Sequence, residues 1–256
     1  MQTSDAARWI EIEIEFDLLE NYISLIKTNY NKLIEGEKEK TTKKIEELQA
    51  EENNEFIIEE ISAGLEPLEN GIIPRFLSAS AIIAIWGAYE SFLQSIATKV
   101  ARDQRIELQM SDLKGDFLQR SKNYFRKVLD IDMYSEKTDL NFLAKIYDLR
   151  NALAHANGRL SDIHNVDVPE FKKWLASRKE VDVVDEEYLI VSFDFVEQSF
   201  KFVKALISEL TTRLDVYIYQ SHPNLATEWY QNNPRKRLRS ALPGQTPSRV
   251  PSEIVM

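Results

Sequence analysis

The sequence predicts a mostly helical, all-α fold in which antiparallel helices form a bundle. The chain of 256 residues contains only seven glycines and eight prolines, about half of the usual share of roughly 12%, and this scarcity disfavours turn-rich β folds. Hydrophobic residues make up 43% of the chain, which is enough to bury a core and excludes disorder of the chain as a whole. Several long stretches also repeat their apolar residues at helical spacing.

Residues 1–70 are predicted to form a long N-terminal helical hairpin. The apolar alternation from Ile10 to Phe16 would suit a strand, but it is short and a heptad pattern continues beyond it. The second helix, over residues 35–70, carries 12 acidic and 4 basic residues and is predicted to present a solvated acidic face. The apolar seam of the first helix alternates spacings of four and three and consists of Ile12, Phe16, Leu19, Ile23, Ile26, Tyr30 and Leu33.

Residues 71–220 are predicted to form the bundle itself. A boundary near residue 70 is indicated by a series of helix-breaking residues: Gly64, Pro67, Gly71 and Pro74. Pro74 suits the first turn of a new helix, where an amide hydrogen is not needed. Helices are predicted over 75–102, 117–129, 140–156 and 195–219, and a small β-hairpin of strands 181–184 and 188–193 precedes the last helix. The last helix is predicted to direct Phe195, Phe202, Ala205, Leu206, Leu210 and Leu214 toward the core.

The apolar stretch 76–98 is long enough, at 23 residues, to cross a bilayer. It contains four serines, a glutamine and the charged Glu90, and this polarity favours a buried core helix over a membrane span. We therefore expect no membrane partner. The polar opening, Met1–Arg8, lacks the features of a secretory signal, so the expected location is the cytoplasm.

Residues 221–256 are predicted to form a disordered, proline-rich basic tail, since five of the eight prolines lie between Pro223 and Pro251. Its basic run could contact RNA or could only make the tail soluble. The basic residues are Arg235, Lys236, Arg237 and Arg239.

The overall composition excludes several classes of site. The chain has no cysteine, so disulfides, Cys-ligated metal sites and Cys nucleophiles are ruled out. Its net charge of −10 argues against indiscriminate attraction to nucleic-acid phosphates. A local basic cleft on an RNA enzyme remains compatible with that charge.

The segment 148–158 carries the most chemical information. On a helix, one face gathers apolar residues and must point to the core: Phe142, Ile146, Leu149, Ala152, Leu153 and Ala156. The other face gathers Tyr147, Arg150, Asn151, Ala154 and His155. Arg150 and His155 lie about 140° apart around the helix, with Asn151 and the small Ala154 between them. The helix is predicted to end at Asn157 and Gly158, a good C-terminal cap.

These polar residue types suit RNA cleavage without a metal ion. The reaction needs a base near the ribose 2′-hydroxyl and positive charge on the phosphate. A neutral histidine can take the proton, an arginine can hold two phosphate oxygens, and an asparagine can orient either residue. Two protomers that pack these faces about a two-fold axis would share the acid and base roles.

The pattern over residues 74–220 resembles the HEPN superfamily, a group of small helical bundles that includes many ribonucleases. Residues 81–93, with the acidic Glu90, are similar to the family's early helix, and Arg150, Asn151 and His155 match its Arg-x(4–6)-His motif. The resemblance implies a HEPN-like bundle and a metal-independent endoribonuclease that needs no cofactor, leaves 2′,3′-cyclic phosphate ends and works as a homodimer through the 140–156 helix. Such enzymes often act as toxins or in antiviral defence.

The resemblance further implies that Arg150, Asn151 and His155 are catalytic and that Glu90 is an accessory residue holding Arg150. Toxins of this family that a partner nucleotidyltransferase silences usually carry a tyrosine two positions after the histidine, where this chain has Asn157. That mode of regulation is therefore in doubt.

Two other hypotheses stay open at this point. The chain could be a non-catalytic, HEPN-like dimeric binding or scaffold module, whose acidic N-terminal hairpin recruits a partner. It could also be neutralised by a regulatory partner protein. Within the motif, His155 could serve only to cap the helix or to form the interface, and Arg150 could form a structural ion pair with Glu90 or Asp148.

Overall fold

This computed structural model describes residues 3–49, 54–65, 68, 71–135, 138–163, 168–184 and 187–221, with no side-chain account of 3–13, 72, 168 and 215–221. The predicted basic tail, including Arg235, Lys236, Arg237 and Arg239, and residues 185–186 of the predicted hairpin turn lie outside the described residues. The chain divides into two compact units, Met1–Ile207 and Ser208–Met256.

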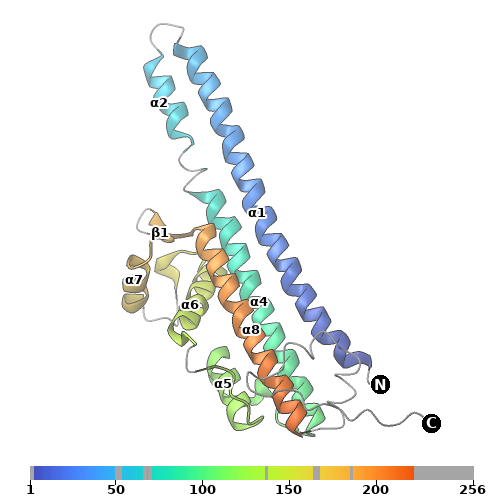
Figure 1. The fold of residues 1–256 in the computed structure, drawn as a ribbon. Helices are drawn as coiled ribbons and strands as arrows, with labels where there is room; N and C mark the ends of the chain where they lie inside the picture. Colours follow the sequence, from blue (N-terminus) through green and yellow to red (C-terminus); the bar gives the residue numbers. More distant parts are fainter. Residues whose placement is uncertain are drawn as a thin grey trace, which may run out of the picture. The chain divides into compact units, whose positions relative to one another are not determined.

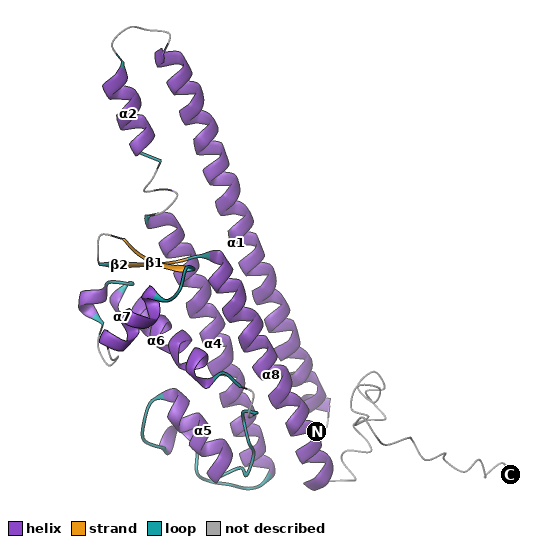
Figure 2. Ribbon diagram, turned by 60° about the vertical axis from the view of Figure 1, so that its left-hand side comes forward, coloured by secondary structure: helices purple, strands orange, loops and turns teal. Residues whose placement is uncertain are grey.

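The all-α prediction is confirmed. The described residues form seven α-helices and one antiparallel β-hairpin that precedes the last helix (Figures 1 and 2). The helices are α1 (Thr3–Gln49), α2 (Glu55–Ala63), α4 (Ile72–Asp103), α5 (Phe117–Lys127), α6 (Leu140–Ala156), α7 (Val168–Ala176) and α8 (Phe193–Ser221). The strands are β1 (Val181–Val184) and β2 (Tyr188–Val191), and short 3-10 turns cover Met110–Asp112 and Leu160–Asp162.

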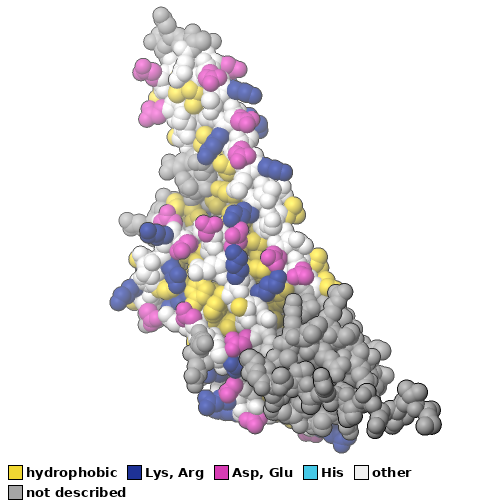
Figure 3. All heavy atoms as spheres, in the orientation of Figure 1, with side chains coloured by type: hydrophobic (Ala, Val, Ile, Leu, Met, Phe, Trp, Pro, Cys, Tyr) yellow, Lys and Arg dark blue, Asp and Glu magenta, His cyan; other side chains and the backbone are white. Residues whose placement is uncertain are grey.

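The N-terminal hairpin differs from the predicted one in the lengths of its helices. The prediction of a long second helix over residues 35–70 is wrong, because α1 continues to Gln49 and α2 covers only nine residues. Residues 35–49 are mostly Glu, Lys and other good helix formers with no proline, so nothing ends the helix there. Acidic and basic side chains are interspersed along α1 and α2 on the face shown in Figure 3.

The buried residues of α1 match the predicted seam at first, but further along the helix the buried positions shift away from it. Phe16 and Ile23 are buried, but at the far end Leu33 is 44% exposed and the neighbouring Ile34 is buried. A straight helix with 3.6 residues per turn rotates about 20° per heptad away from a strict seven-residue repeat. The heptad prediction for Leu33 is therefore wrong by one residue.

Helix α1 is tied by side chains to α4 and to the first part of α8. Tyr22 Oη lies 3.1 Å from Ser80 Oγ on α4. Lys27 Nζ donates to Glu197 Oε1 at 2.8 Å, and Lys204 Nζ donates to Glu20 Oε2 at 2.6 Å. These pairs are partly exposed, so they fix the register of the helices more than they stabilise the fold.

Helix α4 supplies the centre of the core. It is the one helix in the described part of the chain whose length and composition alone would suit a membrane span. Its buried face packs on α1, α5, α6 and β2, and this packing favours the predicted core helix. Pro74 lies in its first turn, as predicted. Trp86, Tyr89 and Phe92 are among its fully buried or nearly fully buried side chains.

Helix α6 has the predicted bounds because its sequence specifies both ends. Asp139 caps the start by accepting the Phe142 N–H at 2.9 Å. At the other end Asn157 and Gly158 adopt left-handed backbone angles, with φ of 49° and 72°, and the Gly158 N–H donates to Ala152 O at 3.0 Å. Leu189 N–H of β2 then donates to Gly158 O at 2.9 Å, which holds the end of α6 against the hairpin.

The region after α6 contains one helix that the sequence patterns did not predict. Helix α7 buries Phe171 and Leu175, and Trp174 stacks on Phe171 with 5.8 Å between ring centroids. The hairpin pairs Val181 with Val191 and Val184 with Tyr188. The second strand was predicted to reach residue 193, but Phe193 begins α8, because Ser192 caps that helix by accepting the Phe195 N–H at 3.2 Å.

The core face of α8 follows the prediction with one exception. Phe195, Leu206, Leu210 and Leu214 are buried and Phe202 is half-buried, but Ala205 is exposed. Val196, Val203 and Ile207 are buried instead, since the apolar stripe passes on the other side of Leu206 from Ala205.

A buried tyrosine pair predicts alkaline sensitivity. Tyr89 Oη lies 2.9 Å from Tyr134 Oη. Burial raises the pKa of Tyr89 well above 10.0 and that of Tyr134 to about 12. Because the folded-state values lie above the unfolded value, the pair's contribution to stability is complete below about pH 10 and is lost as the pH rises towards 12. We expect alkaline urea titrations to show this loss, and the double variant Tyr89→Phe, Tyr134→Phe to lose less stability over the same range.

Candidate functional site

The predicted site residues Glu90, Arg150 and Asn151 lie together between α4 and α6. Arg150 Nη1 donates to Asn151 Oδ1 at 2.9 Å, and Arg150 Nη2 lies 3.9 Å from Glu90 Oε2. The Arg150 side chain is 22% exposed and that of Glu90 is 29% exposed. The single acid of the apolar stretch 76–98 therefore faces the arginine, as the sequence analysis expected.

Trp86 is a part of this cluster that the sequence analysis did not include among the site residues. It is fully buried, and its Nε1–H donates to Glu90 Oε1 at 2.7 Å. Its ring lies 5.1 Å from that of Tyr147 on α6, centroid to centroid. Trp86 and Glu90 are four residues apart and so share one helix face, a signal that the sequence already contained. One carboxylate oxygen is thus fixed by Trp86 while the other faces Arg150.

The two Nη atoms of the Arg150 guanidinium face Asn151 and Glu90, but its Nε does not share these contacts. Its Nε is buried and has no hydrogen-bond partner among the described residues. A buried donor without a partner costs free energy, about 1–3 kcal/mol.

His155 lies on the same polar face of α6, further toward its C-terminal end. It is exposed, as is the neighbouring Ala154, and Asn151 is half-buried. Among the described residues no hydrogen bond to the His155 imidazole is observed. The core face of the helix is buried as predicted, with Leu149 and Leu153 at 4% exposure or less. The helix therefore presents Arg150, Asn151 and His155 away from the core.

Asp148 takes part in a different ion pair and is not the partner of Arg150. Lys145 Nζ lies 3.4 Å from Asp148 Oδ2 and 3.0 Å from Glu170 Oε1 on α7. Burial raises the pKa of Asp148 above its usual value, and Lys145 opposes that shift. This pair joins α6 to α7. Of the two partners considered for Arg150, the structure selects Glu90.

Two cavities in the described part of the chain lie along α4 and not at the motif. They have volumes of about 290 and 330 Å³, and their shared residues are Gln94, Thr98 and Arg102. Neither cavity is lined by Arg150 or His155. In the described residues no group of three or more His, Asp or Glu side chains could hold a metal ion.

Comparison of the chain with protein-family models, curated proteins and solved structures finds no match. The functional conclusions below consequently depend on the residues and geometry of this chain.

Proposed function

We propose that the protein is a metal-independent endoribonuclease of HEPN type, with Arg150, Asn151 and His155 at its active site. The observation that carries the proposal is the arrangement on α6, where Arg150 contacts Glu90 and Asn151 and His155 is exposed on the same helix. The proposed reaction needs no metal or cofactor. A cytoplasmic location, and a role as a toxin or in antiviral defence, belong to the same proposal.

Each residue has a defined chemical role in this proposal. His155 removes the proton from the ribose 2′-hydroxyl, and the 2′-oxygen attacks the adjacent phosphorus. The bond between phosphorus and the 5′-oxygen breaks, which leaves a 2′,3′-cyclic phosphate on one fragment and a 5′-hydroxyl on the other. Arg150 stabilises the added negative charge on the phosphate oxygens, and Asn151 and Glu90 keep its guanidinium in place.

The leaving 5′-oxygen also needs a proton, and one copy of the motif has a single histidine. In a homodimer that packs α6 on α6, a second His155 would supply this proton. The exposed Ala154 lies between Arg150 and His155 around the helix, so its small side chain permits the close approach that such a contact needs. The proposed dimer thus completes the site.

This dimer gives a direct prediction. Ala154→Glu places two like charges and added bulk at the centre of the proposed contact, so we expect sedimentation to show a monomer and RNA cleavage to fall with it. Ala205→Glu, at an exposed alanine on α8, is the matched control and should remain dimeric and active. A dimer that persists in Ala154→Glu would contradict the α6 interface.

The chemistry of the RNA ends that cleavage leaves tests the proposed type of reaction. Purified protein is incubated with mixed cellular RNA in excess chelator, and the new 3′ ends are examined with a phosphatase that opens cyclic phosphates. We expect cyclic-phosphate fragments that accumulate with time. Intact RNA, or fragments with free 3′-hydroxyl ends, would contradict the proposal.

A second candidate function is a non-catalytic, HEPN-like dimeric binding or scaffold module. It is favoured by one observation, namely that both cavities lie away from Arg150 and His155, whose face is open. On this hypothesis the motif serves only dimerisation, Arg150 and Glu90 form a structural ion pair, and the α1–α2 hairpin recruits a partner protein. It predicts a dimer that breaks in Ala154→Glu but no RNA cleavage by the wild type.

A further inference from the structure

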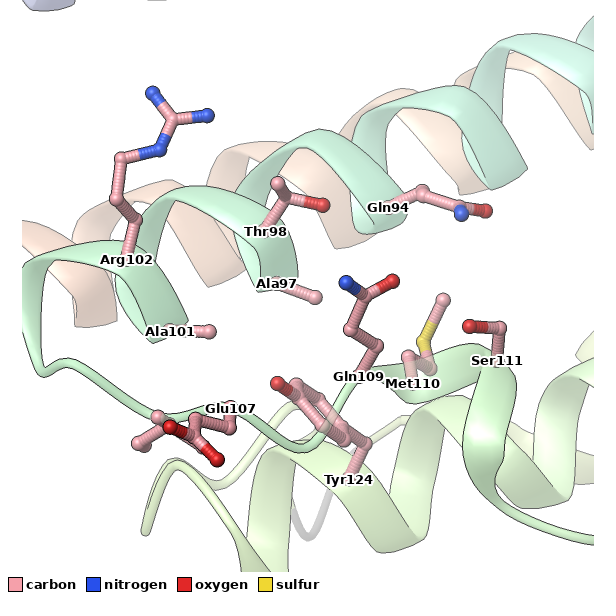
Figure 4. Close-up of a pocket in the computed structure, with 11 residues that line it drawn as sticks. Gln94, Ala97, Thr98, Ala101, Arg102, Glu107, Gln109, Met110, Ser111 and Tyr124 are labelled. Atoms are coloured by element: carbon pink, nitrogen blue, oxygen red, sulfur yellow. The ribbon is translucent and has the colours of Figure 1, made fainter.

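A polar groove follows α4 from Ser91 to Arg102, and Figure 4 shows its part from Gln94 onward. It combines the cavities of about 290 and 330 Å³, which adjoin at Gln94, Thr98 and Arg102. Together they are in the range of a small-ligand site, roughly 300–1,000 Å³. Ser91 and Arg102 line the groove eleven residues apart on α4, which corresponds to roughly 16 Å along the helix axis.

The groove begins about one helical turn from Glu90 along the same face of α4. Glu90, Gln94, Ala97 and Ala101 lie within about 60° of one another around the helix. Gln94 is one turn from Glu90, and Glu90 faces Arg150 at 3.9 Å. An RNA strand with a phosphate at Arg150 would therefore place its next nucleotide in the groove.

The opposite wall is a well-anchored part of the chain. The segment after α4 returns past the helix, and Figure 4 shows the Gln109 side chain pointing across the cavity toward α4. The Gln109 N–H donates to Asp112 Oδ2 at 2.8 Å, and Tyr124 Oη on α5 donates to Leu108 O at 2.7 Å. The wall that carries Gln109 is thus positioned before any ligand binds.

The lining has the chemistry of a nucleotide site. The exposed amides of Gln94 and Gln109 can pair with a base edge, above a floor formed by the buried Ala97, Ala101 and Met110. Hydroxyl groups for the ribose and phosphate come from Ser91, Ser95, Thr98 and Ser111. Arg102 is exposed and extends outward at the end of the groove.

The local charge is opposite to that of the whole chain. Residues 99–127, which cover the end of α4, the connecting segment and α5, contain eight Lys or Arg and four Asp or Glu, a net charge of +4. The whole chain carries −10. A polyanion is therefore attracted to this end of α4 and repelled from the acidic N-terminal hairpin.

We propose that this groove binds the single-stranded RNA segment on one side of the cut. One base lies between Gln94 and Gln109, and Arg102 contacts a phosphate further along. This inference rests on the proposed ribonuclease function for the position of the cut, but RNA binding by the groove is measurable without cleavage.

The test measures binding and cleavage separately. Binding is followed by fluorescence anisotropy with a labelled 2′-O-methyl RNA of mixed sequence, which cannot form a cyclic phosphate and is not consumed. Thr98→Trp fills the groove from an exposed position and should raise the Kd about tenfold or more, since the loss of one base contact has an effect of this size. Arg102→Gln should lower the slope of log Kd against log salt by about 0.7, as expected for one phosphate contact.

Two matched variants serve as controls. Gln198→Ala and Lys201→Gln on α8 change exposed residues outside the groove and outside the basic segment 99–127 and should leave binding unchanged. With cleavable RNA, Gln94→Ala should raise KM with little change in kcat and should alter the base preferred next to the cut.

The outcomes separate this inference from the proposed function. A loss of RNA binding in Thr98→Trp supports the proposal that the groove binds RNA, whether or not the wild type cuts RNA. Unchanged RNA binding in both Thr98→Trp and Arg102→Gln overturns the proposal that the groove binds RNA, even if cleavage by the wild type depends on His155. Circular dichroism of Thr98→Trp identifies any loss of binding that is due to misfolding, in which case Arg102→Gln decides.

Discussion

Arg150→Lys is expected to lower kcat/KM for RNA cleavage by about 10²–10³, the effect of removing one donor from a charge-stabilising site. Lysine keeps the positive charge but loses the planar fork that can hold two phosphate oxygens while still contacting Asn151. Stability should change by about 1 kcal/mol or less, because the ion pair with Glu90 is partly exposed. Single-turnover kinetics and urea unfolding measure the two effects.

The matched control for this prediction is Arg213→Lys. Arg213 Nη2 pairs with Glu209 Oε1 at 3.0 Å within α8, so the control also alters an arginine–carboxylate pair of similar exposure. Its cleavage rate should equal that of the wild type. An Arg150→Lys protein that is as active as Arg213→Lys would show that Arg150 is only a structural residue.

Trp86→Ala is expected to lower the free energy of unfolding by about 3–5 kcal/mol, as for other fully buried aromatic residues. Trp86 is 0% exposed and packs on Tyr89, Phe117 and Tyr147. Trp86→Phe retains most of this packing but removes the hydrogen bond to Glu90, and should cost about 1–2 kcal/mol. Urea unfolding followed by circular dichroism measures both losses.

Cleavage by Trp86→Phe distinguishes positioning from packing. Without its Trp86 hydrogen bond Glu90 holds Arg150 less firmly, so we expect a several-fold lower kcat. Trp174→Phe, at a half-buried tryptophan stacked on Phe171, should leave cleavage unchanged. Equal cleavage rates in Trp86→Phe and Trp174→Phe would show that Glu90 does not position Arg150 for cleavage.

The parts of the fold that the sequence predicts are those set by local signals. Helix α6 has its predicted bounds because Asp139 caps its start and Asn157 and Gly158 end it with left-handed backbone angles. The extent of α1 was predicted wrongly, since the charged segment after Leu33 contains no proline and α1 continues through its one glycine, Gly36. Helix α7 was missed because its nine residues are too few for a clear periodic pattern.

In the candidate site, too, the sequence predicts what local signals determine and does not predict what the tertiary fold brings together. The pairing of Glu90 with Arg150 could be expected from the sequence, because a lone acid in an apolar helix needs a partner. The hydrogen bond from Trp86 follows from i, i+4 spacing and could have been found. The groove could not be predicted, since Gln94 and Gln109 meet only because the segment after α4 turns back on that helix.

The central claim is that the α6 motif cuts RNA without a metal ion. Contaminating ribonucleases also leave cyclic phosphates, so the decisive measurement is a comparison of identically purified proteins in excess chelator. The first-order rate of RNA cleavage is measured for the wild type, His155→Ala and His222→Ala, a histidine to which no role is assigned. We expect His155→Ala to be slower by about 10²–10⁴, the contribution of a general acid or base, and His222→Ala to match the wild type. An unchanged rate in His155→Ala would contradict the account.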